Sequence, residues 1–193
     1  MPDAIPLWEL ALNQFEPRQR GAFYGPAAQL SPGAGVLYSG ITFPEFNVET
    51  GRFSARRGSI LILTHECDID GDNDRILNES FVFAPLIFLD ALEEEFKRKG
   101  MESAVTGFIA NVVSNNVNRL FYLPPPDEIL GVQGLGKGAL IFWNQLSNTH
   151  VSQLNSDDAT PICALSEYGL EHADRHFRQH FLRPKSDLLA RLR

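Results

Sequence analysis

The sequence predicts an α+β fold in which a small sheet or barrel forms the core. Short apolar runs typical of strands gather between residues 35 and 165, two stretches with helical spacing interrupt them at 89–113, and a longer amphipathic stretch follows. We expect one domain of 193 residues. It should have an N-terminal helix and irregular arm over 1–34, a barrel over 35–165 that carries the helical insertion, and a C-terminal helical segment over 166–193.

Two apolar runs are the clearest strands. The run 59–64, Ser-Ile-Leu-Ile-Leu-Thr, has the composition of a central strand that is buried on both faces. The run 81–88 is similarly apolar, and we expect the two runs to be adjacent in the sheet. Before them, 35–40 predicts a short strand, and Pro44 makes 41–48 an edge strand or a loop because proline cannot donate to a ladder.

The second half of the chain alternates helices and short strands. The spacing of Leu89, Leu92 and Phe96 predicts a helix that Gly100 ends, and 102–113 predicts a second helix. Further strands are expected at 120–123, 139–146 and 160–165.

A last helix is expected after Ser166, a residue type favoured at the N-cap. Its apolar stripe consists of Leu170, Ala173, Phe177 and Phe181. His172, His176 and His180 flank this stripe at a spacing that can hold a metal ion, although imidazoles at such a boundary are commonly structural.

Composition and charge exclude several classes of protein. Hydrophobic residues make up 44% of the chain and charged residues 21%, which excludes a disordered chain. The net charge of −7 argues against a protein that coats nucleic acid through bulk positive charge. The sequence shows no apolar run of membrane-spanning length and no basic and apolar leader. We therefore expect a cytoplasmic protein without membrane contact, in which Cys67 and Cys163 are free thiols.

The densest cluster of reactive side chains is the segment 65–74, His-Glu-Cys-Asp-Ile-Asp-Gly-Asp-Asn-Asp, directly after the first apolar run. In a structural interpretation, Asp68 caps the turn and Cys67 is a small buried residue at the root of the loop. Because unpaired carboxylates are not buried, we expect the loop to leave the core with its later aspartates exposed, namely Asp70, Asp72 and Asp74.

A metal site is the second interpretation of this segment. Aspartates alternate along it and Glu79 is twelfth counted from Asp68, as in an EF-hand calcium loop, although Asn73 replaces the usual glycine and strands flank the loop. The candidate ligands are Asp68, Asp70, Asp72 and Glu79. We expect a protein without a cofactor. The alternatives are a calcium ion held by these residues or a zinc ion at the Cys67 loop.

A nucleophilic thiol is the third interpretation. In an extended strand His65 would share a face with Cys67 and could activate it, and His150 is a remote alternative base. The acidic neighbourhood works against this chemistry, because it disfavours the thiolate.

Three segments, taken in order, resemble the MazF/PemK toxin family. Arg57-Gly58 leads into the first apolar run, Val-Phe-Ala-Pro-Leu follows at 82–86, and Ile-Cys-Ala-Leu-Ser at 162–166 precedes an amphipathic helix. The resemblance implies an SH3-like barrel over about 35–182, and an RNA-cleaving site to which the strand-opening arginine, here Arg57, belongs. The family's second site position carries a hydroxyl after the proline-containing strand, whereas this chain has Leu-Ile-Phe at 86–88.

The chain also looks like uncharacterised bacterial or phage proteins built around a strand followed by Cys-Asp-Ile. We expect an accessory or binding protein of such origin, linked to a toxin–antitoxin or phage-defence system, with a protein partner or a second copy as its ligand. The alternatives are a MazF/PemK-type endoribonuclease, with Arg57 as electrostatic stabiliser and His65 as general acid–base, and a metal- or thiol-dependent hydrolase.

The candidate catalytic residues are Arg57, His65, Cys67 and Asp68. A second surface for a partner is the basic C-terminal segment, which carries Arg175, Arg178, Arg183, Lys185, Arg191 and Arg193. It could contact nucleic acid or an acidic protein, or could be an ordinary basic helix end.

Overall fold

The computed structural model describes residues 22–25, 30–70, 79–113, 117–126, 135–136 and 138–182, without the side chains of 102–106 and 113. The strands in this part of the chain are β1 (Val36–Asn47), β2 (Arg52–Ile62), β3 (Ser80–Phe88), β4 (Leu120–Leu123), β5 (Ala139–Phe142), β6 (Ser147–His150) and β7 (Thr160–Ala164). The helices are α3 (Glu66–Ile69), α4 (Leu89–Arg98), α5 (Glu102–Val113) and α6 (Glu167–Phe181), with the 3-10 helices η2 (Trp143–Gln145) and η3 (Val151–Asn155). The mixed helix and sheet class is therefore confirmed.

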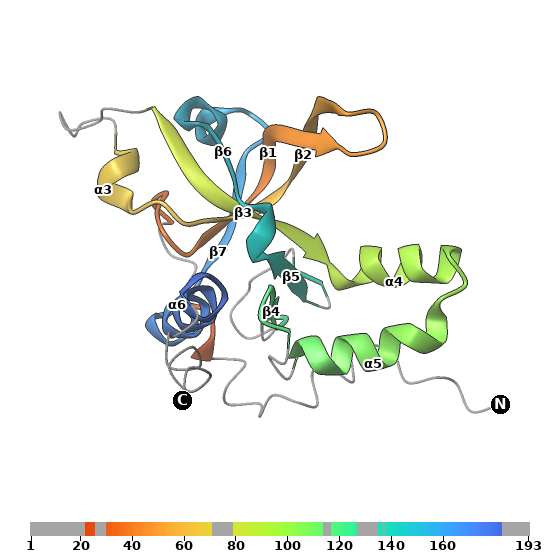
Figure 1. Cartoon of the computed structure of the whole chain (residues 1–193). Coiled ribbons are helices and arrows are strands. Elements are labelled where there is room, and N and C mark those ends of the chain that lie inside the picture. Colours follow the sequence, from red (N-terminus) through yellow and green to blue (C-terminus); the bar gives the residue numbers. More distant parts are fainter. Residues whose placement is uncertain are drawn as a thin grey trace, which may run out of the picture.

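The seven strands form one antiparallel sheet in the order β4-β5-β3-β2-β1-β7, with β6 also paired to β3 (Figure 1). Among the described strands no pairing joins β4 to β7, so this sheet is open at both ends of its path and the expected closure into a barrel is not confirmed. The N-terminal helix expected before residue 22 and the basic residues after 182 lie outside the described part of the chain.

β1 and β2 form a long hairpin, which Figure 1 shows extending beyond the rest of the sheet. β1 continues as a strand through the proline at position 44, where the sequence predicted an edge strand or a loop. On the edge of β1 that does not face β2, β7 pairs only with residues 36–39 and does not reach this proline. The inner ends of both strands are buried, whereas the outer ends carry the exposed rings of Phe46 and Phe53 opposite one another.

β3 pairs with three other strands. On one edge it pairs with β2, through Ile60↔Pro85 and Ile62↔Phe83, which confirms the expected adjacency of the two apolar runs. On the other edge it pairs first with β6 and then with β5. The ladder with β2 continues past Ile62, because the Thr64 hydroxyl accepts a hydrogen bond from the Val82 N–H at 2.7 Å.

The strand expected over 139–146 ends at Phe142, and η2 replaces its last part. Ile141 pairs with Leu86, and Ser147 pairs with Phe83. Two residues of β3 therefore lie between these pairs, whereas the facing segment has five residues there, 142–146. The gap lies beside Pro85, which has no amide N–H to offer a ladder, so the facing chain leaves the sheet there. Trp143 is thereby turned into the core, where it is 1% exposed.

α4 and α5 begin and end where the sequence predicts. Leu89 and Ile109 of these helices are buried with Leu140 of β5 in a small cluster, which is distinct from the two clusters that contain Ile141 of β5 and Phe83 of β3. The chain enters β5 through Gly138, whose φ of 105° is a conformation that glycine adopts without strain.

α6 begins after Ser166, whose side chain accepts a hydrogen bond from the Gly169 N–H at 3.1 Å, so the expected N-cap is confirmed. The face of the helix that meets the sheet differs from the expected stripe. Ala173 and His176 are buried, whereas Leu170 and Phe181 are 38% and 48% exposed.

We expect Phe83→Ala to lower the free energy of unfolding by about 3–5 kcal/mol, because it leaves a cavity between the rings of Phe43 and Phe81. The neighbouring variant Val82→Ala removes a side chain that is 43% exposed on the opposite face of β3, and it should cost less than about 1 kcal/mol. Urea unfolding of both variants is the measurement. Equal destabilisation would contradict the inward orientation of Phe83.

Candidate functional site: the groove between α3 and η3

The reactive segment after β2 folds as a short helix rather than as the end of a strand. His65 is the N-cap of α3, and its Nδ1 accepts a hydrogen bond from the Cys67 N–H at 3.3 Å. The expectation that His65 and Cys67 share one face of an extended strand is therefore wrong. His65 faces the main chain of Cys67 because Nδ1 supplies the acceptor that the first turn of a helix lacks.

Cys67 is exposed, which corrects the expectation that it is largely buried. In the helix, residues two positions apart point in nearly opposite directions. Ile69 takes the position facing the core, where it is 8% exposed, and Cys67 therefore faces solvent. Asp70 is exposed, as expected, whereas Asp72 and Asp74 lie outside the described residues.

The topology of the sheet brings α3 and η3 together. β2 and β6 pair with opposite edges of β3, since Phe83 pairs with both Ile62 and Ser147. Both strands are antiparallel to β3, so both run the same way and end near its first residue, Ser80. α3 follows β2, and η3 follows β6, so the two short helices flank the start of β3 (Figure 1).

A groove of about 550 Å³ lies between these two helices. Its walls are Ile69 on the α3 side and Val151 and Leu154 on the η3 side. The polar residues that line it are Ser31, Glu66, Cys67, Asp70 and Asn155. The described residues that line it include two carboxylates and no lysine, arginine or histidine, so it favours a cationic ligand.

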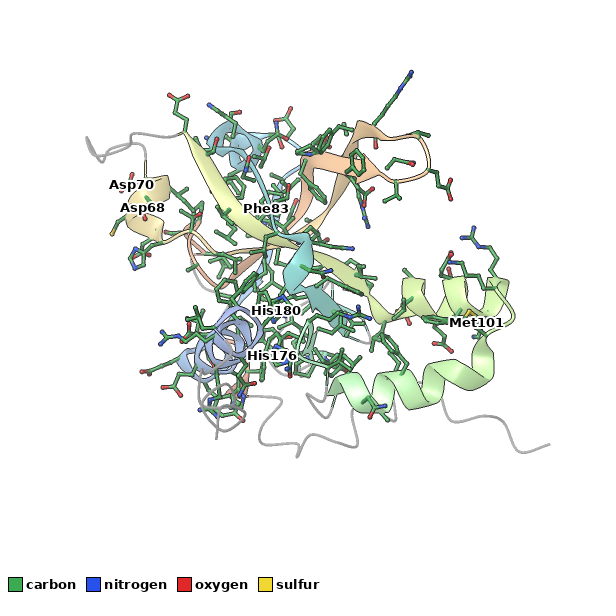
Figure 2. The ribbon with its side chains drawn as sticks, in the orientation of Figure 1. Asp68, Asp70, Phe83, Met101, His176 and His180 are labelled. Atoms are coloured by element: carbon green, nitrogen blue, oxygen red, sulfur yellow. The ribbon has the colours of Figure 1, made fainter. Side chains whose placement is uncertain are left out.

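Only part of the predicted catalytic set reaches the groove. Cys67 lines it, His65 caps the helix that forms one wall, and Asp68 is an exposed residue of that helix (Figure 2). Arg57 lies on the β1–β2 hairpin instead, where its guanidinium forms an ion pair with Asp158 at 2.7 Å.

The candidate metal ligands are also divided. Glu79 Oε2 lies 2.7 Å from His150 Nε2, and Asp72 lies outside the described residues. Within the part of the chain that the structure describes, no three or more His, Cys, Asp or Glu side chains are grouped so that they could hold a metal ion.

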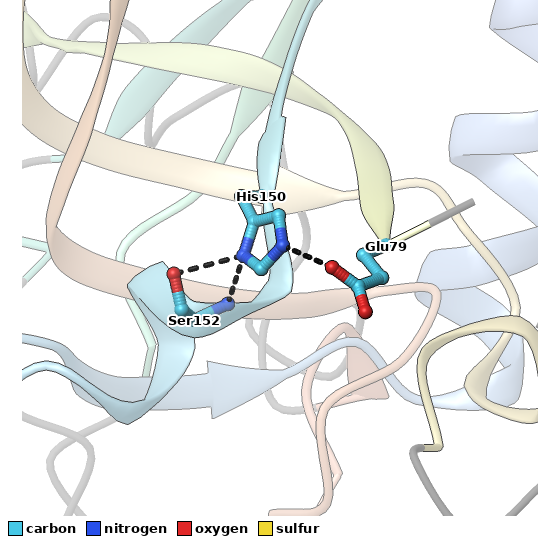
Figure 3. A network of polar contacts seen from close by, with 3 residues as sticks. All are labelled: Glu79, His150 and Ser152. Carbon is cyan, nitrogen blue, oxygen red and sulfur yellow. Dashed lines mark hydrogen bonds and ion pairs between the residues drawn. The ribbon is translucent and has the colours of Figure 1, made fainter.

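A polar network at the start of β3 was not predicted from the sequence (Figure 3). His150 Nε2 lies 2.7 Å from Glu79 Oε2, and His150 Nδ1 lies 2.9 Å from the Ser152 hydroxyl and 3.1 Å from the Ser152 main-chain nitrogen. A signal existed in the sequence, because His150-Val-Ser152 repeats the His-x-nucleophile pattern of His65-Glu-Cys67. Nothing in the sequence, however, placed Glu79 beside it.

The histidines of α6 have a structural role at His176. Its Nδ1 accepts a hydrogen bond from the Trp143 Nε1–H at 2.8 Å, inside the core. Burial, followed by the nearby His180, lowers the pKa of His176 to about 4. Burial also lowers the pKa of His172, whose ring packs against that of Tyr168 at an interplanar angle of 59°. Figure 2 shows His176 and His180 where α6 meets the sheet.

In comparisons with known proteins, no protein-family model and no curated protein matches the chain. The resemblance to MazF/PemK toxins therefore stays a prediction. In the structurally described part of the chain, no helix is both long and apolar enough to cross a membrane.

We expect iodoacetamide at pH 8 to modify Cys67 and to spare Cys163 in the folded protein. Cys67 is exposed, whereas Cys163 is inaccessible and burial raises its pKa to about 12, which keeps the thiol protonated. Intact-mass measurement should show one adduct in buffer and two in urea. Cys67→Ser should show no adduct before unfolding, and a rapid second adduct in the folded wild type would contradict the burial of Cys163.

Acid should destabilise the fold through His176. The folded pKa of about 4 lies below the value near 6.5 of an unfolded chain, so the unfolded state binds more protons between these values. The free energy of unfolding should be fully retained above pH 6.5 and should fall as the pH drops toward 4. His176→Gln keeps an acceptor for Trp143 and does not titrate, so its loss over this window should be smaller. Parallel losses measured by urea unfolding would contradict the assignment.

Proposed function

We propose that this chain is a binding protein whose groove between α3 and η3 takes a positively charged segment of a protein partner. The observation that carries the proposal is the lining of the groove, in which Glu66 and Asp70 face a partly apolar cavity with no basic side chain among the described residues. Its volume of about 550 Å³ is within the range of binding pockets.

The apolar and the acidic residues of the lining suit different parts of a lysine or arginine side chain. Methylene groups can lie along Ile69, Val151 and Leu154 while the charged head meets the carboxylates of Glu66 and Asp70. Attraction between such opposite charges mainly raises the rate of encounter and selects partners of the correct sign. The net charge of −7 acts in the same direction at longer range.

The proposed setting is the cytoplasm of a bacterium, or of a bacterium infected by a phage. Cys67, which is exposed, and Cys163 are not joined in a disulfide, which is compatible with a reducing compartment. The resemblance to MazF/PemK toxins supports a role as an accessory protein of a toxin–antitoxin or phage-defence system, and the SH3-like barrel stays part of that proposal.

The thiol-dependent hydrolase is the second candidate, because Cys67 is exposed on the wall of the groove. Ester or peptide turnover that disappears in Cys67→Ala would replace the binding proposal with this one. The ribonuclease predicted by the resemblance requires RNA cleavage that disappears in both Arg57→Ala and His65→Ala.

We expect a fluorescein-labelled hexa-arginine peptide to bind the purified chain, and a hexa-glutamate peptide not to bind. The double variant Glu66→Gln/Asp70→Asn removes the carboxylates of the groove and should weaken the binding at least about fivefold in Kd. Fluorescence anisotropy at two salt concentrations is the measurement, and the affinity should fall as salt is added.

The matched control is Glu49→Gln/Glu171→Gln, which makes the same change in net charge at exposed positions that do not line the groove. It should leave the dissociation constant for hexa-arginine within about twofold of the wild type. Salt screens the attraction between the bound peptide and exposed carboxylates that lie away from the groove. Equal weakening in the two double variants, or no binding by the wild type, would remove the proposal.

A further inference from the structure

The contacts of His150 determine its tautomer. The main-chain N–H of Ser152 can only donate, so Nδ1 of His150, 3.1 Å away, is an acceptor without a proton. In the neutral ring the proton then resides on Nε2, which lies 2.7 Å from Glu79 Oε2 and donates to it. The Ser152 hydroxyl, 2.9 Å from the same Nδ1, must in turn donate its proton to the imidazole.

This order of donors places a hydroxyl, a base and an orienting carboxylate in one chain of hydrogen bonds (Figure 3). Capping η3 requires only the main-chain N–H of Ser152, so the contacts to its hydroxyl and to Glu79 are additional to the cap. Together they match the arrangement of an activated nucleophile, in which the base touches the hydroxyl and a third group orients the base.

The network is also accessible to a substrate. Ser152 is exposed, and the side chains of His150 and Glu79 are 50% and 73% exposed. Ser152 belongs to η3, and three other residues of that helix, Val151, Leu154 and Asn155, line the 550 Å³ groove. A molecule seated in the groove therefore lies against the element that carries the hydroxyl.

We propose that Ser152, His150 and Glu79 form a nucleophilic site that cleaves carboxylic esters, an activity beyond the binding function proposed above. Ser152 Oγ attacks the ester carbonyl carbon, and its proton moves to His150 Nδ1, which for that time no longer accepts from the Ser152 main-chain N–H. The imidazolium is stabilised by the Glu79 carboxylate. As the acyl–oxygen bond breaks, Nδ1 returns the proton to the departing alcohol. Water then hydrolyses the Ser152 ester, which releases the acid and restores the hydroxyl.

Labelling with a fluorophosphonate tests the nucleophile directly. The expected reaction forms a bond between Ser152 Oγ and phosphorus and expels fluoride, and mass spectrometry of the digested protein should place the adduct on Ser152. p-Nitrophenyl acetate should give a burst of nitrophenol. Both signals should disappear in Ser152→Ala. The main-chain N–H of this variant still donates to His150 Nδ1, which caps η3, so its thermal stability should match that of the wild type.

Two further variants separate the roles of the other groups. His150→Gln keeps an acceptor for the cap but removes the base, and it should slow labelling at least about tenfold. Glu79→Gln keeps an acceptor for Nε2–H but loses the charge, so it should slow labelling while nitrogen NMR shows the His150 tautomer unchanged. Ser156→Ala, at a serine that instead hydrogen-bonds to the Gln153 carbonyl, should label at the wild-type rate.

An adduct on any residue other than Ser152, or equal labelling rates in wild type and His150→Gln, would overturn the inference and leave the network as a helix cap with a surface contact between a histidine and a carboxylate. The result is independent of the binding proposal. Hexa-arginine affinity measured on Ser152→Ala reports on the groove alone, so the two proposals can fail separately.

Discussion

Pairing on both edges of β3 is the constraint from which the rest of the structure follows. β2 takes one edge, and β6 and β5 share the other, with a change of partner beside the proline at position 85. Because β2 and β6 run in the same direction on either side of β3, the segments that follow them emerge at the same end of the sheet. The groove, the α3 helix and the polar network are all located by this pairing.

The change of partner also shapes the opposite side of the molecule. Where the facing chain leaves the sheet it forms η2, and this turn directs Trp143 into the core. The indole N–H then needs an acceptor, which His176 of α6 supplies. This hydrogen bond connects α6 to the point where the sheet is interrupted. The imidazole must stay neutral to accept the bond, so acid weakens the connection.

The two histidines that begin the groove helices show how one local motif can have different surroundings. His65 and His150 each accept a hydrogen bond from the main chain two residues later, which satisfies a donor at the start of a short helix. At His150 the strand start of β3 adds Glu79 to the other ring nitrogen. The difference arises from pairing between segments that are about seventy residues apart.

Local patterns by themselves determined most of the elements, because apolar periodicity and capping residues act within a few positions of the chain. The α4 and α5 boundaries, the β4 strand, the Ser166 cap and the adjacency of β2 and β3 follow from such patterns. Only tertiary structure decided that Cys67 faces solvent. The short helix can turn either Cys67 or Ile69 toward the core, and it buries Ile69, which is the larger apolar group. It also decided the partners of His150 and His176, because hydrogen bonds across the sheet depend on register, which no local spacing specifies.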